Sequence, residues 1–316
     1  MFHPFVILAT DAEVTMAAFE ILDPAFTSFM LPNATLETLA EGCRWLEGPV
    51  WFGDHECLLF SDLPSDRVLR WSESGGVSVF RKPAGFANGH TRDREGRLIT
   101  CSHQHRNLTR TEPDGRITVL ASHYQGRRLN SPNDVIVKRD GSIWFTDPLY
   151  GISTDYEGGK QESERPPAVY RLNPQSGELS IVADDFEGPN GLCFSPDEQR
   201  LYIVETGQQF APHPVQHIRE FRVSPDGRHL SQGRVFHEVS PGSADGIRCD
   251  QDGNLWTSAG DGVHCLNPEG VLLGKIRTPA PVSNLTFGGR HLSRLFLCAS
   301  QTLYAIYVNR RGVPFP

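Results

Sequence analysis

Short apolar runs bounded by polar turns recur along the chain from about residue 46 to residue 308. Ile143-Trp144-Phe145-Thr146 follows the turn Arg139–Ser142, and Leu255-Trp256-Thr257 follows the turn Gln251–Asn254. Both turns contain Asp-Gly, which is a hairpin signal because aspartate and glycine tolerate positive φ. The pattern therefore predicts short antiparallel strands joined by tight hairpins.

A second series of turns follows the third predicted strand of each unit. Pro-Asp-Gly or Pro-Glu-Gly occurs within Glu112–Gly115, Ser224–Gly227 and Asn267–Gly270. Proline sets φ early in such turns and glycine closes them. Each unit is therefore predicted to hold four strands.

One short phrase, opened by an acid or an amide, returns six times. Its first positions, 47, 88, 133, 190, 245 and 284, are separated by 41, 45, 57, 55 and 39 residues. Repeats of this length are typical of propellers and solenoids. The phrases are Glu47-Gly48-Pro49-Val50, Asn88-Gly89-His90-Thr91, Asn133-Asp134-Val135-Ile136, Asn190-Gly191-Leu192-Cys193, Asp245-Gly246-Ile247-Arg248 and Asn284-Leu285-Thr286-Phe287.

Six units of four strands predict an all-β fold, a six-bladed β-propeller over residues 38–316 with a short N-terminal extension over residues 1–37. We expect a strand near Thr38–Cys43 to pair beside the C-terminal strand and close the ring, since closure protects sheet edges. The far N-terminus is expected to be a dimer arm or disordered.

Composition narrows the possible partners and compartments. The net charge is −8 without long charge runs, so no basic stripe predicts nucleic-acid binding. Phe5–Ala9 is apolar but too short to span a membrane and lacks a basic region before it. Seven cysteines without CxxC spacing favour a reduced, cytoplasmic protein, with a periplasmic location open if the true start differs. A monomer or a homodimer is expected.

In a closed ring, the six phrase-opening residues lie nearest the axis on one face. Glu47 and Asp245 supply carboxylates and the asparagines supply amide oxygens. Ca²⁺ prefers such oxygen ligands, whereas zinc prefers His and Cys ligands. The same strand register places a second ring at the ends of the second strands: Asp62, His103, Asp147, Glu205 and the loop Ser258–Asp261. The sequence thus predicts a divalent metal site, either catalytic or purely structural.

Several segments resemble the gluconolactonase branch of the SMP-30, or regucalcin-like, lactonases. They are Leu46–Trp51, Ser131–Val135, Trp144–Pro148, Gly188–Leu192, Asp245–Ile247 and the closing Leu303–Asn309. The resemblance covers the chain from about residue 20 onward. It implies a six-bladed propeller that holds one divalent metal ion and hydrolyses sugar lactones such as glucono-δ-lactone.

The resemblance also implies roles for individual residues. The metal ligands fall on Glu47, Asn190 and Asp245, the metal- or substrate-binding asparagine on Asn133, and the general base on Asp245. Animal members carry an arginine two residues before that asparagine, where this chain has Ser131. Substrate binding is therefore expected from other side chains: Asn133, Asp147, Arg127 or Arg128, Tyr150 and His103.

The expected chemistry is ester hydrolysis assisted by Ca²⁺, with Zn²⁺ or Mn²⁺ as alternatives. Asp147 and Glu205 are alternative bases, and His90 or His103 could serve a histidine-driven variant. A Ser-His-Asp esterase is disfavoured because no G-x-S-x-G motif is present. A non-catalytic binding platform with a structural metal, or a metal-dependent esterase or phosphotriesterase, remains open, since fold alone does not decide function.

Overall fold

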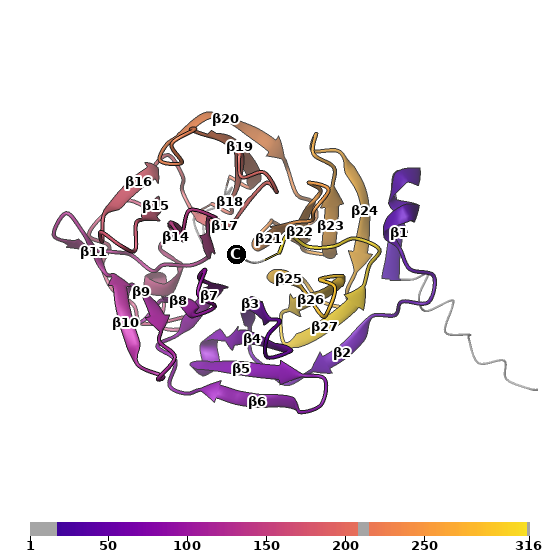
Figure 1. The fold of residues 1–316 in the computed structure, drawn as a ribbon, viewed down its shortest axis with the longest axis horizontal. Helices are drawn as coiled ribbons and strands as arrows, with labels where there is room; N and C mark the ends of the chain where they lie inside the picture. The colour runs from indigo at the N-terminus through magenta and orange to yellow at the C-terminus, as the bar shows by residue number, and fades with distance from the viewer. Residues whose placement is uncertain (1–17, 208–214, 315–316) are drawn as a thin grey trace, which may run out of the picture.

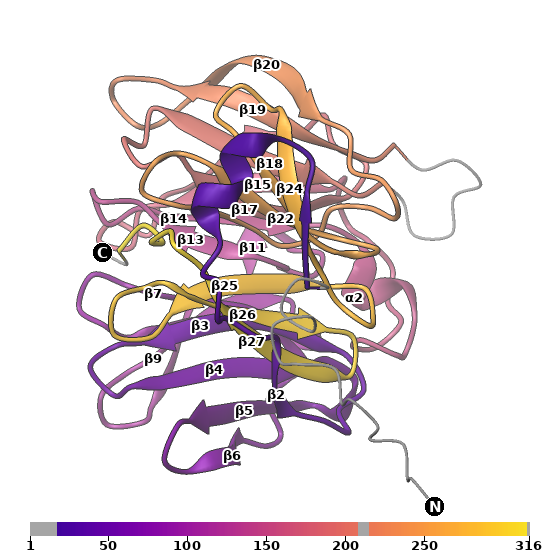
Figure 2. The same cartoon turned by 90° about the vertical axis from the view of Figure 1, so that its right-hand side faces the viewer.

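Six antiparallel sheets surround a central axis in the computed structural model, which describes residues 18–207 and 215–314. The first strand of each sheet lies nearest the axis, and the later strands lie progressively further out (Figure 1). The side view shows the sheets stacked around the ring (Figure 2). The predicted six-bladed β-propeller is confirmed.

Each of the first four blades is formed by four strands consecutive in the sequence. The strands are β3 (Leu46–Phe52), β4 (Cys57–Asp62), β5 (Arg67–Ser72) and β6 (Gly76–Arg81) in blade one; β7 (Ala87–Arg92), β8 (Leu98–Ser102), β9 (Asn107–Thr111) and β10 (Ile117–Ala121) in blade two; β13 (Val135–Val137), β14 (Ile143–Asp147), β15 (Ala168–Leu172) and β16 (Leu179–Ala183) in blade three; and β17 (Pro189–Phe194), β18 (Arg200–Glu205), β19 (His217–Val223) and β20 (Leu230–His237) in blade four.

Blades five and six each recruit a strand from the N-terminal region. Blade five contains β21 (Ile247–Cys249), β22 (Leu255–Ala259), β23 (Gly262–Leu266) and β24 (Leu272–Arg277), with β1 (Phe19–Ile21) added at its outer edge. Blade six contains β25 (Asn284–Gly288), β26 (Arg294–Ala299) and β27 (Thr302–Tyr307), and its outer strand is β2 (Glu37–Ala40). The strand expected near Thr38–Cys43 is thus present one residue earlier and closes the ring.

Short elements outside the blades connect or cover them. They are the 3₁₀ segments η1 (Pro24–Phe29) and η2 (Leu63–Ser65), the hairpin β11 (His123–Tyr124) and β12 (Arg127–Arg128), and the four-residue helix α2 (Tyr150–Ser153). Within 18–207 and 215–314, no helix is long and apolar enough to cross a membrane. The far N-terminus, predicted to be a dimer arm or disordered, corresponds largely to residues 1–17, which lie outside the described residues.

Apolar side chains fill the spaces between neighbouring blades. Trp144 of blade three is fully buried in one cluster with Leu201 and Phe221 of blade four, and its indole stands edge-on to Phe194. Burying each such side chain contributes about 1.5–3 kcal/mol relative to leaving it exposed. This packing fixes the blades relative to one another and so fixes what their inner strands present to the axis.

The glycines that follow the phrase-opening residues allow neighbouring inner strands to touch. A Cβ on Gly89 would lie 2.3 Å from the Asn133 carbonyl oxygen, and one on Gly191 would lie 2.0 Å from that of Asp245. The amides of these two glycines instead donate to the same carbonyls at 2.8 and 3.0 Å. The Asn-Gly pairs therefore serve close packing of the inner strands, which brings the opening side chains together.

Candidate active site

The phrase-opening side chains meet at one end of the central channel. Five of them line a cavity of about 170 Å³: Glu47, Asn88, Asn133, Asn190 and Asp245. The sixth, Asn284, lies beside the cavity and donates its amide Nδ2 to Glu47 Oε2 at 3.3 Å. The predicted convergence of these six residues is therefore present in the fold.

The two carboxylates of the ring are held in an unfavourable electrostatic environment. Burial raises the pKa of Glu47 to about 8, although Asn284 and the Gly48 amide donate hydrogen bonds to it. Burial, with the negative charge of Glu47 nearby, holds the pKa of Asp245 well above its usual range. Two like charges in a low-dielectric cavity repel each other, and a cation between them would relieve both effects.

The asparagines are ordered by a relay of side-chain hydrogen bonds. Asn88 Nδ2 donates to Asn133 Oδ1 at 2.6 Å, and Asn133 Nδ2 donates to Asn190 Oδ1 at 2.7 Å. Asn190 Nδ2 then donates to Thr206 Oγ1 at 3.0 Å, and that hydroxyl donates to the Ala244 carbonyl at 3.1 Å. The relay fixes the positions of the Asn133 and Asn190 oxygens, and each carbonyl retains lone-pair capacity for another partner.

The donor set fits a hard divalent cation. Glu47 and Asp245 provide charge, and Asn190 and Asn133 provide neutral oxygens, as Ca²⁺ sites commonly do. Over the described parts of the chain, no three His, Cys, Asp or Glu side chains come close enough together to hold a metal ion. A metal at this cavity would therefore depend on the amide oxygens as well as on the two carboxylates.

The second ring of acidic residues supports the site rather than lining it. Asp62 accepts the Arg44 and Trp45 amides, and Glu205 accepts the Glu187, Gly188 and Gly207 amides at 2.7–2.9 Å. Asp147 likewise accepts the Asn130 amide at 2.8 Å. Each carboxylate thus anchors the backbone two or three residues before the phrase opener of its own blade.

Asp147 therefore has a different position from the one expected of a substrate ligand or base. Its side chain is fully buried and does not line the cavity. Burial raises the pKa of Asp147 to about 7. In blade five the hydroxyl of Ser258 takes the corresponding supporting role, since it accepts the Asp245 amide at 2.8 Å.

His103 lies behind the ring of asparagines. Its Nε2 is 3.1 Å from Asn88 Nδ2 and 3.3 Å from Asn133 Oδ1, and its Nδ1 is 2.9 Å from the Glu157 carbonyl oxygen. Burial lowers the pKa of His103 to about 4, so the imidazole is neutral at pH 7. Because Nδ1 faces a carbonyl oxygen it carries the proton, and Nε2 accepts from Asn88 Nδ2. His103 is therefore a positioning residue for Asn88, which in turn donates to Asn133.

His90 does not reach the cavity. It is buried between Ser61 and Thr100, with its ring nitrogens 2.9 and 3.0 Å from their hydroxyl oxygens. Burial lowers its pKa to about 3. The histidine-driven mechanism that the sequence left open finds no support at this residue.

Among the remaining candidates, only Tyr150 lines the cavity. Its hydroxyl is 2.9 Å from the Gly188 carbonyl oxygen. Arg128 instead holds the loop 161–164, through its backbone amide to Glu164 and its guanidinium to Gln161. Ser131, at the position of the family's arginine, is buried and donates to the Pro148 carbonyl at 2.7 Å, so it anchors the turn before α2.

Five further lining residues were not predicted from the sequence: Trp45, Leu63, Glu157, Thr206 and Gly207. Trp45 donates its indole N–H to Glu47 Oε1 at 3.2 Å. Glu157 comes from the long loop between β14 and β15, and burial raises its pKa. The spacing of 57 residues after Asn133 signals this insertion, because long loops in compact folds are often functional.

The fold and the site define the class of protein: a six-bladed β-propeller with two buried carboxylates and several amide oxygens at one end of its central channel. Residues 45–301 match the model of the SMP-30/Gluconolactonase/LRE-like region. The protein belongs to this family. A gluconolactonase of Zymomonas mobilis is 31% identical over 308 residues, covering 92% of this chain and 85% of the relative.

Solved structures give the same assignment. A gluconolactonase from Xanthomonas campestris is 39% identical with a TM-score of 0.85, covering 92% of this chain and 94% of the other. A putative gluconolactonase superposes with a TM-score of 0.86 at 37% identity, covering 94% and 99% of the two chains. A regucalcin from Agrobacterium tumefaciens, at 18% identity and TM-score 0.71 over 89% and 97%, shares the fold.

Proposed function

We propose that the protein is a metal-dependent lactonase that opens sugar lactones, with glucono-δ-lactone to gluconate as the representative reaction. Membership of the family and similarity to the Zymomonas mobilis and Xanthomonas campestris gluconolactonases support lactone hydrolysis. A pentonolactonase of Haloferax volcanii, 26% identical over 81% of both chains, supports a sugar-lactone substrate class. The single observation that carries the proposal is the pair of buried carboxylates, Glu47 and Asp245, that share a cavity with oriented amide oxygens.

In this proposal, Glu47, Asn190 and Asp245 hold one divalent cation, and Asn133 binds either the cation or the substrate. Ca²⁺ suits the all-oxygen donor set best, and Zn²⁺ and Mn²⁺ are the alternatives to be ranked. When bound, such an ion polarises the lactone carbonyl and lowers the pKa of a coordinated water.

The chain's own residues supply orientation and proton transfer. The indole of Trp45 and the side chain of Leu63 form an apolar part of the wall, against which a sugar ring can lie. Tyr150 and Glu157 lie on the same cavity and offer polar contacts to sugar hydroxyls. Position 131 holds a serine instead of the family's arginine, so other residues would bind the substrate. Asp147 and Arg128 do not line the cavity and are not part of this proposed substrate site.

Asp245 is proposed as the general base because its carboxylate lines the cavity in which the substrate would bind. It would take a proton from the attacking water as the oxygen adds to the lactone carbonyl carbon. When the acyl carbon–ring oxygen bond breaks, that proton goes to the leaving alkoxide. The product is an open chain with one hydroxyl and one carboxylic acid, and the acid ionises to the carboxylate and releases one proton to the solvent.

The experiment follows acid release from glucono-δ-lactone, with spontaneous hydrolysis subtracted, for chelator-stripped protein refilled with Ca²⁺, Zn²⁺ or Mn²⁺. Asp245→Ala is compared with Asp114→Ala, which removes an exposed turn carboxylate. Activity should vanish with the metal, return on refilling, be lost in Asp245→Ala and persist in Asp114→Ala. Folded, metal-loaded protein that hydrolyses no lactone in a panel would overturn the proposal and favour a binding platform.

We further propose that the protein works in a reducing compartment such as the cytoplasm. All seven cysteines are buried free thiols. A β-propeller of this kind would act as a monomer or homodimer on a small-molecule substrate, without nucleic acid.

A further inference from the structure

The opposite end of the channel holds a second, larger cavity of about 470 Å³. As in the candidate active site, equivalent positions of successive inner strands line this cavity. Residues three positions after the phrase openers line it in five blades: Thr91, Ile136, Cys193, Arg248 and Phe287. Because these residues come from the far ends of the inner strands, the cavity is separated from Glu47 and Asp245 by the length of the strands.

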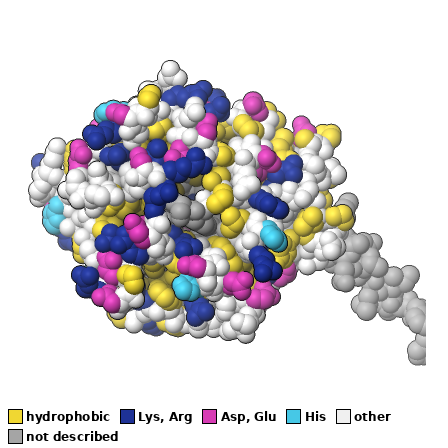
Figure 3. Space-filling model, in the orientation of Figure 1, with side chains coloured by type: hydrophobic (Ala, Val, Ile, Leu, Met, Phe, Trp, Pro, Cys, Tyr) yellow, Lys and Arg dark blue, Asp and Glu magenta, His cyan; other side chains and the backbone are white. Residues whose placement is uncertain are grey.

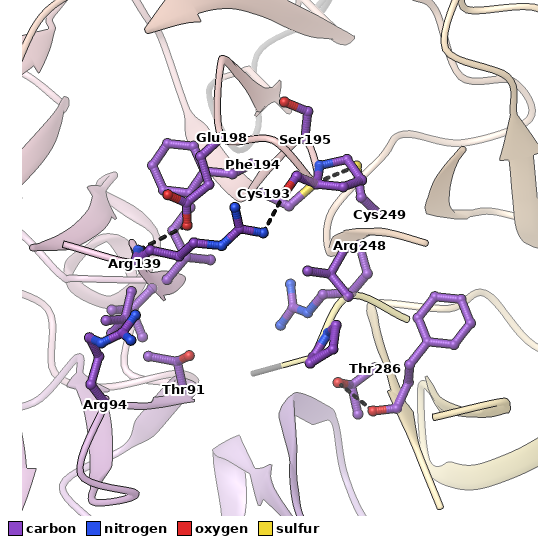
Figure 4. Close-up of a pocket in the computed structure, with 17 residues that line it drawn as sticks. Thr91, Arg94, Arg139, Cys193, Phe194, Ser195, Glu198, Arg248, Cys249 and Thr286 are labelled. Carbon is purple, nitrogen blue, oxygen red and sulfur yellow. Dashed lines mark hydrogen bonds between the residues drawn. The ribbon is translucent and has the colours of Figure 1, made fainter. Parts of the chain in front are cut away.

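Two arginines at equivalent positions in neighbouring blades form part of its rim. Arg94 lies six residues after Asn88, and Arg139 lies six residues after Asn133, each in the first turn of its blade. The close-up shows the guanidinium groups of Arg139 and Arg248 directed toward one open space, with Arg94 at its edge (Figure 4). In the space-filling view, basic side chains lie on one side of the middle of this face and hydrophobic side chains lie on the other (Figure 3).

The positive charge of this rim is poorly compensated. Among residues 18–207 and 215–314, no carboxylate oxygen lies within 4 Å of a side-chain nitrogen of Arg94 or Arg139. Arg139 donates to the Pro196 carbonyl at 2.6 Å, a neutral acceptor. Glu198 is the single acidic side chain in the described lining, and it is already paired with Lys138 at 3.2 Å.

Arg248 brings the third charge into the wall of the cavity. Its guanidinium is 3.7 Å from Asp134 Oδ2, a buried oxygen without a hydrogen-bond partner in the described structure. Arg248 therefore neutralises one internal carboxylate at long range and retains donors for a ligand. The walls between the arginines include apolar surface from Val137, Phe194 and Phe287.

We propose that this second cavity is a binding site for a small organic anion, one that carries a phosphate or carboxylate group on a compact body. Guanidinium groups bind both oxyanions through paired N–H donors, and the volume falls in the range of small-molecule sites. Arg94, Arg139 and Arg248 recognise the anionic group, and the apolar wall contacts the body of the molecule.

Binding is measured by titration calorimetry on the full chain at about 0.15 M chloride, so that weak screened attraction is suppressed. The probes are inorganic phosphate, glucose 6-phosphate and succinate, which separate phosphate from carboxylate recognition and a bare ion from an organic one. Wild type is compared with the double variant Arg94→Ala/Arg139→Ala and with Arg116→Ala, which removes an exposed arginine of another turn. Asp245→Asn tests whether binding is independent of the candidate active site.

At least one probe should bind wild type, Arg116→Ala and Asp245→Asn alike and bind the double variant at least tenfold more weakly, as expected for lost charge-assisted hydrogen bonds. Equal binding to the double variant, binding lost in Asp245→Asn, or no binding of any probe at 10 mM (about −3 kcal/mol) would overturn the proposal.

A second measurement uses only the wild-type chain. Cys193 and Cys249 line this cavity, with their sulfurs 3.7 Å apart, whereas Cys101 and Cys298 are buried elsewhere. The bound probe should slow modification of Cys193 and Cys249 by a small thiol reagent, mapped by peptide mass spectrometry, and leave Cys101 and Cys298 unchanged. Unchanged modification of Cys193 and Cys249 at a saturating probe concentration would also overturn the proposal.

Discussion

Replacing Asp245 by asparagine should stabilise the metal-free protein at pH 8 while it removes the proposed activity. Glu47 and Asp245 are buried together. Burial raises the pKa of both carboxyls, and the negative charge of Glu47 raises the pKa of Asp245 further. Asparagine keeps the shape of the side chain and one oxygen but removes the charge. The substitution therefore separates the electrostatic cost of the site from its function.

The magnitude follows from Glu47. A carboxyl whose pKa rises from 4.5 in the unfolded chain to about 8 in the fold binds its proton more tightly in the folded state. Stability is therefore lost as pH rises from 4.5 through about 8. For this group alone the loss is about 1 kcal/mol at pH 5 and about 4 kcal/mol at pH 8.

Metal-free wild type should thus lose about 3 kcal/mol of unfolding free energy between pH 5 and pH 8 from Glu47 alone. Asp245, whose pKa is also raised in the fold, adds its own loss to the wild type, and Asp245→Asn removes that contribution, so the total loss should be clearly smaller. Asp147, whose pKa is raised to about 7, adds a loss of the same sign in both proteins and cancels in the comparison.

The assay is urea unfolding of chelator-treated wild type, Asp245→Asn and the exposed control Asp114→Asn at pH 5, 6.5 and 8. Identical pH dependence in wild type and Asp245→Asn would refute the reasoning that the buried Asp245 carboxyl destabilises the metal-free fold as the pH rises. Saturating Ca²⁺ should restore wild type at pH 8 and have much less effect on Asp245→Asn, because ligand binding to the native state adds stability.

Three further predictions concern the supports of the site. Gly191→Ala places a Cβ 2.0 Å from the Asp245 carbonyl oxygen, so it should lower the unfolding free energy by at least about 2 kcal/mol and remove most lactonase activity. The control Gly53→Ala, whose Cβ has its nearest atom at 3.5 Å, should be near neutral. Urea unfolding measures the stability of both variants, and acid-release rates measure their activity. Glu205→Gln leaves at least one of three backbone amides without its acceptor, and it should cost about 1–3 kcal/mol and weaken Ca²⁺ binding in calorimetry. Unchanged stability would contradict the supporting role. Removing residues 1–43 exposes the edge of β27 and should lower the melting temperature in calorimetric scans, and an unchanged value would count against closure by β2.

The fold could be predicted because several independent features of the sequence repeat with the same period. The phrases, the two series of turns and the apolar runs all indicate the same four-stranded unit, so six units imply a ring. The same register predicted that Glu47, Asn133, Asn190 and Asp245 lie together, and the structure places them on one cavity.

Register alone could not predict which way a side chain turns. Asp62, Asp147 and Glu205 lie at the predicted strand ends, but they turn back to backbone amides of their own blades. The position in the strand determines at which end of the blade a side chain lies. The direction in which the side chain points depends on which backbone N–H groups nearby need an acceptor. Ser131 illustrates the same effect, since a nearby carbonyl engages its hydroxyl.

Segments without periodicity were also beyond prediction. Glu157 reaches the cavity from a loop whose sequence carries no strand or helix pattern. Residues 18–36, expected to be part of a separate extension, pack as β1 and η1, with Phe26 fully buried against blade five. Such contacts depend on tertiary packing that local sequence does not encode.

The seam between blades one and six has a consequence for how the protein folds during synthesis. Ser283 donates to the Leu46 carbonyl and Asn284 donates to Glu47, across 237 residues of chain in each case. Glu47 is made early, but its partner and the strand β27 that pairs with β2 emerge late from the ribosome. A nascent chain that lacks blade six can form early blades but not the complete ring of phrase-opening residues. Binding of the proposed cation is therefore expected to be a late event that follows assembly of the ring.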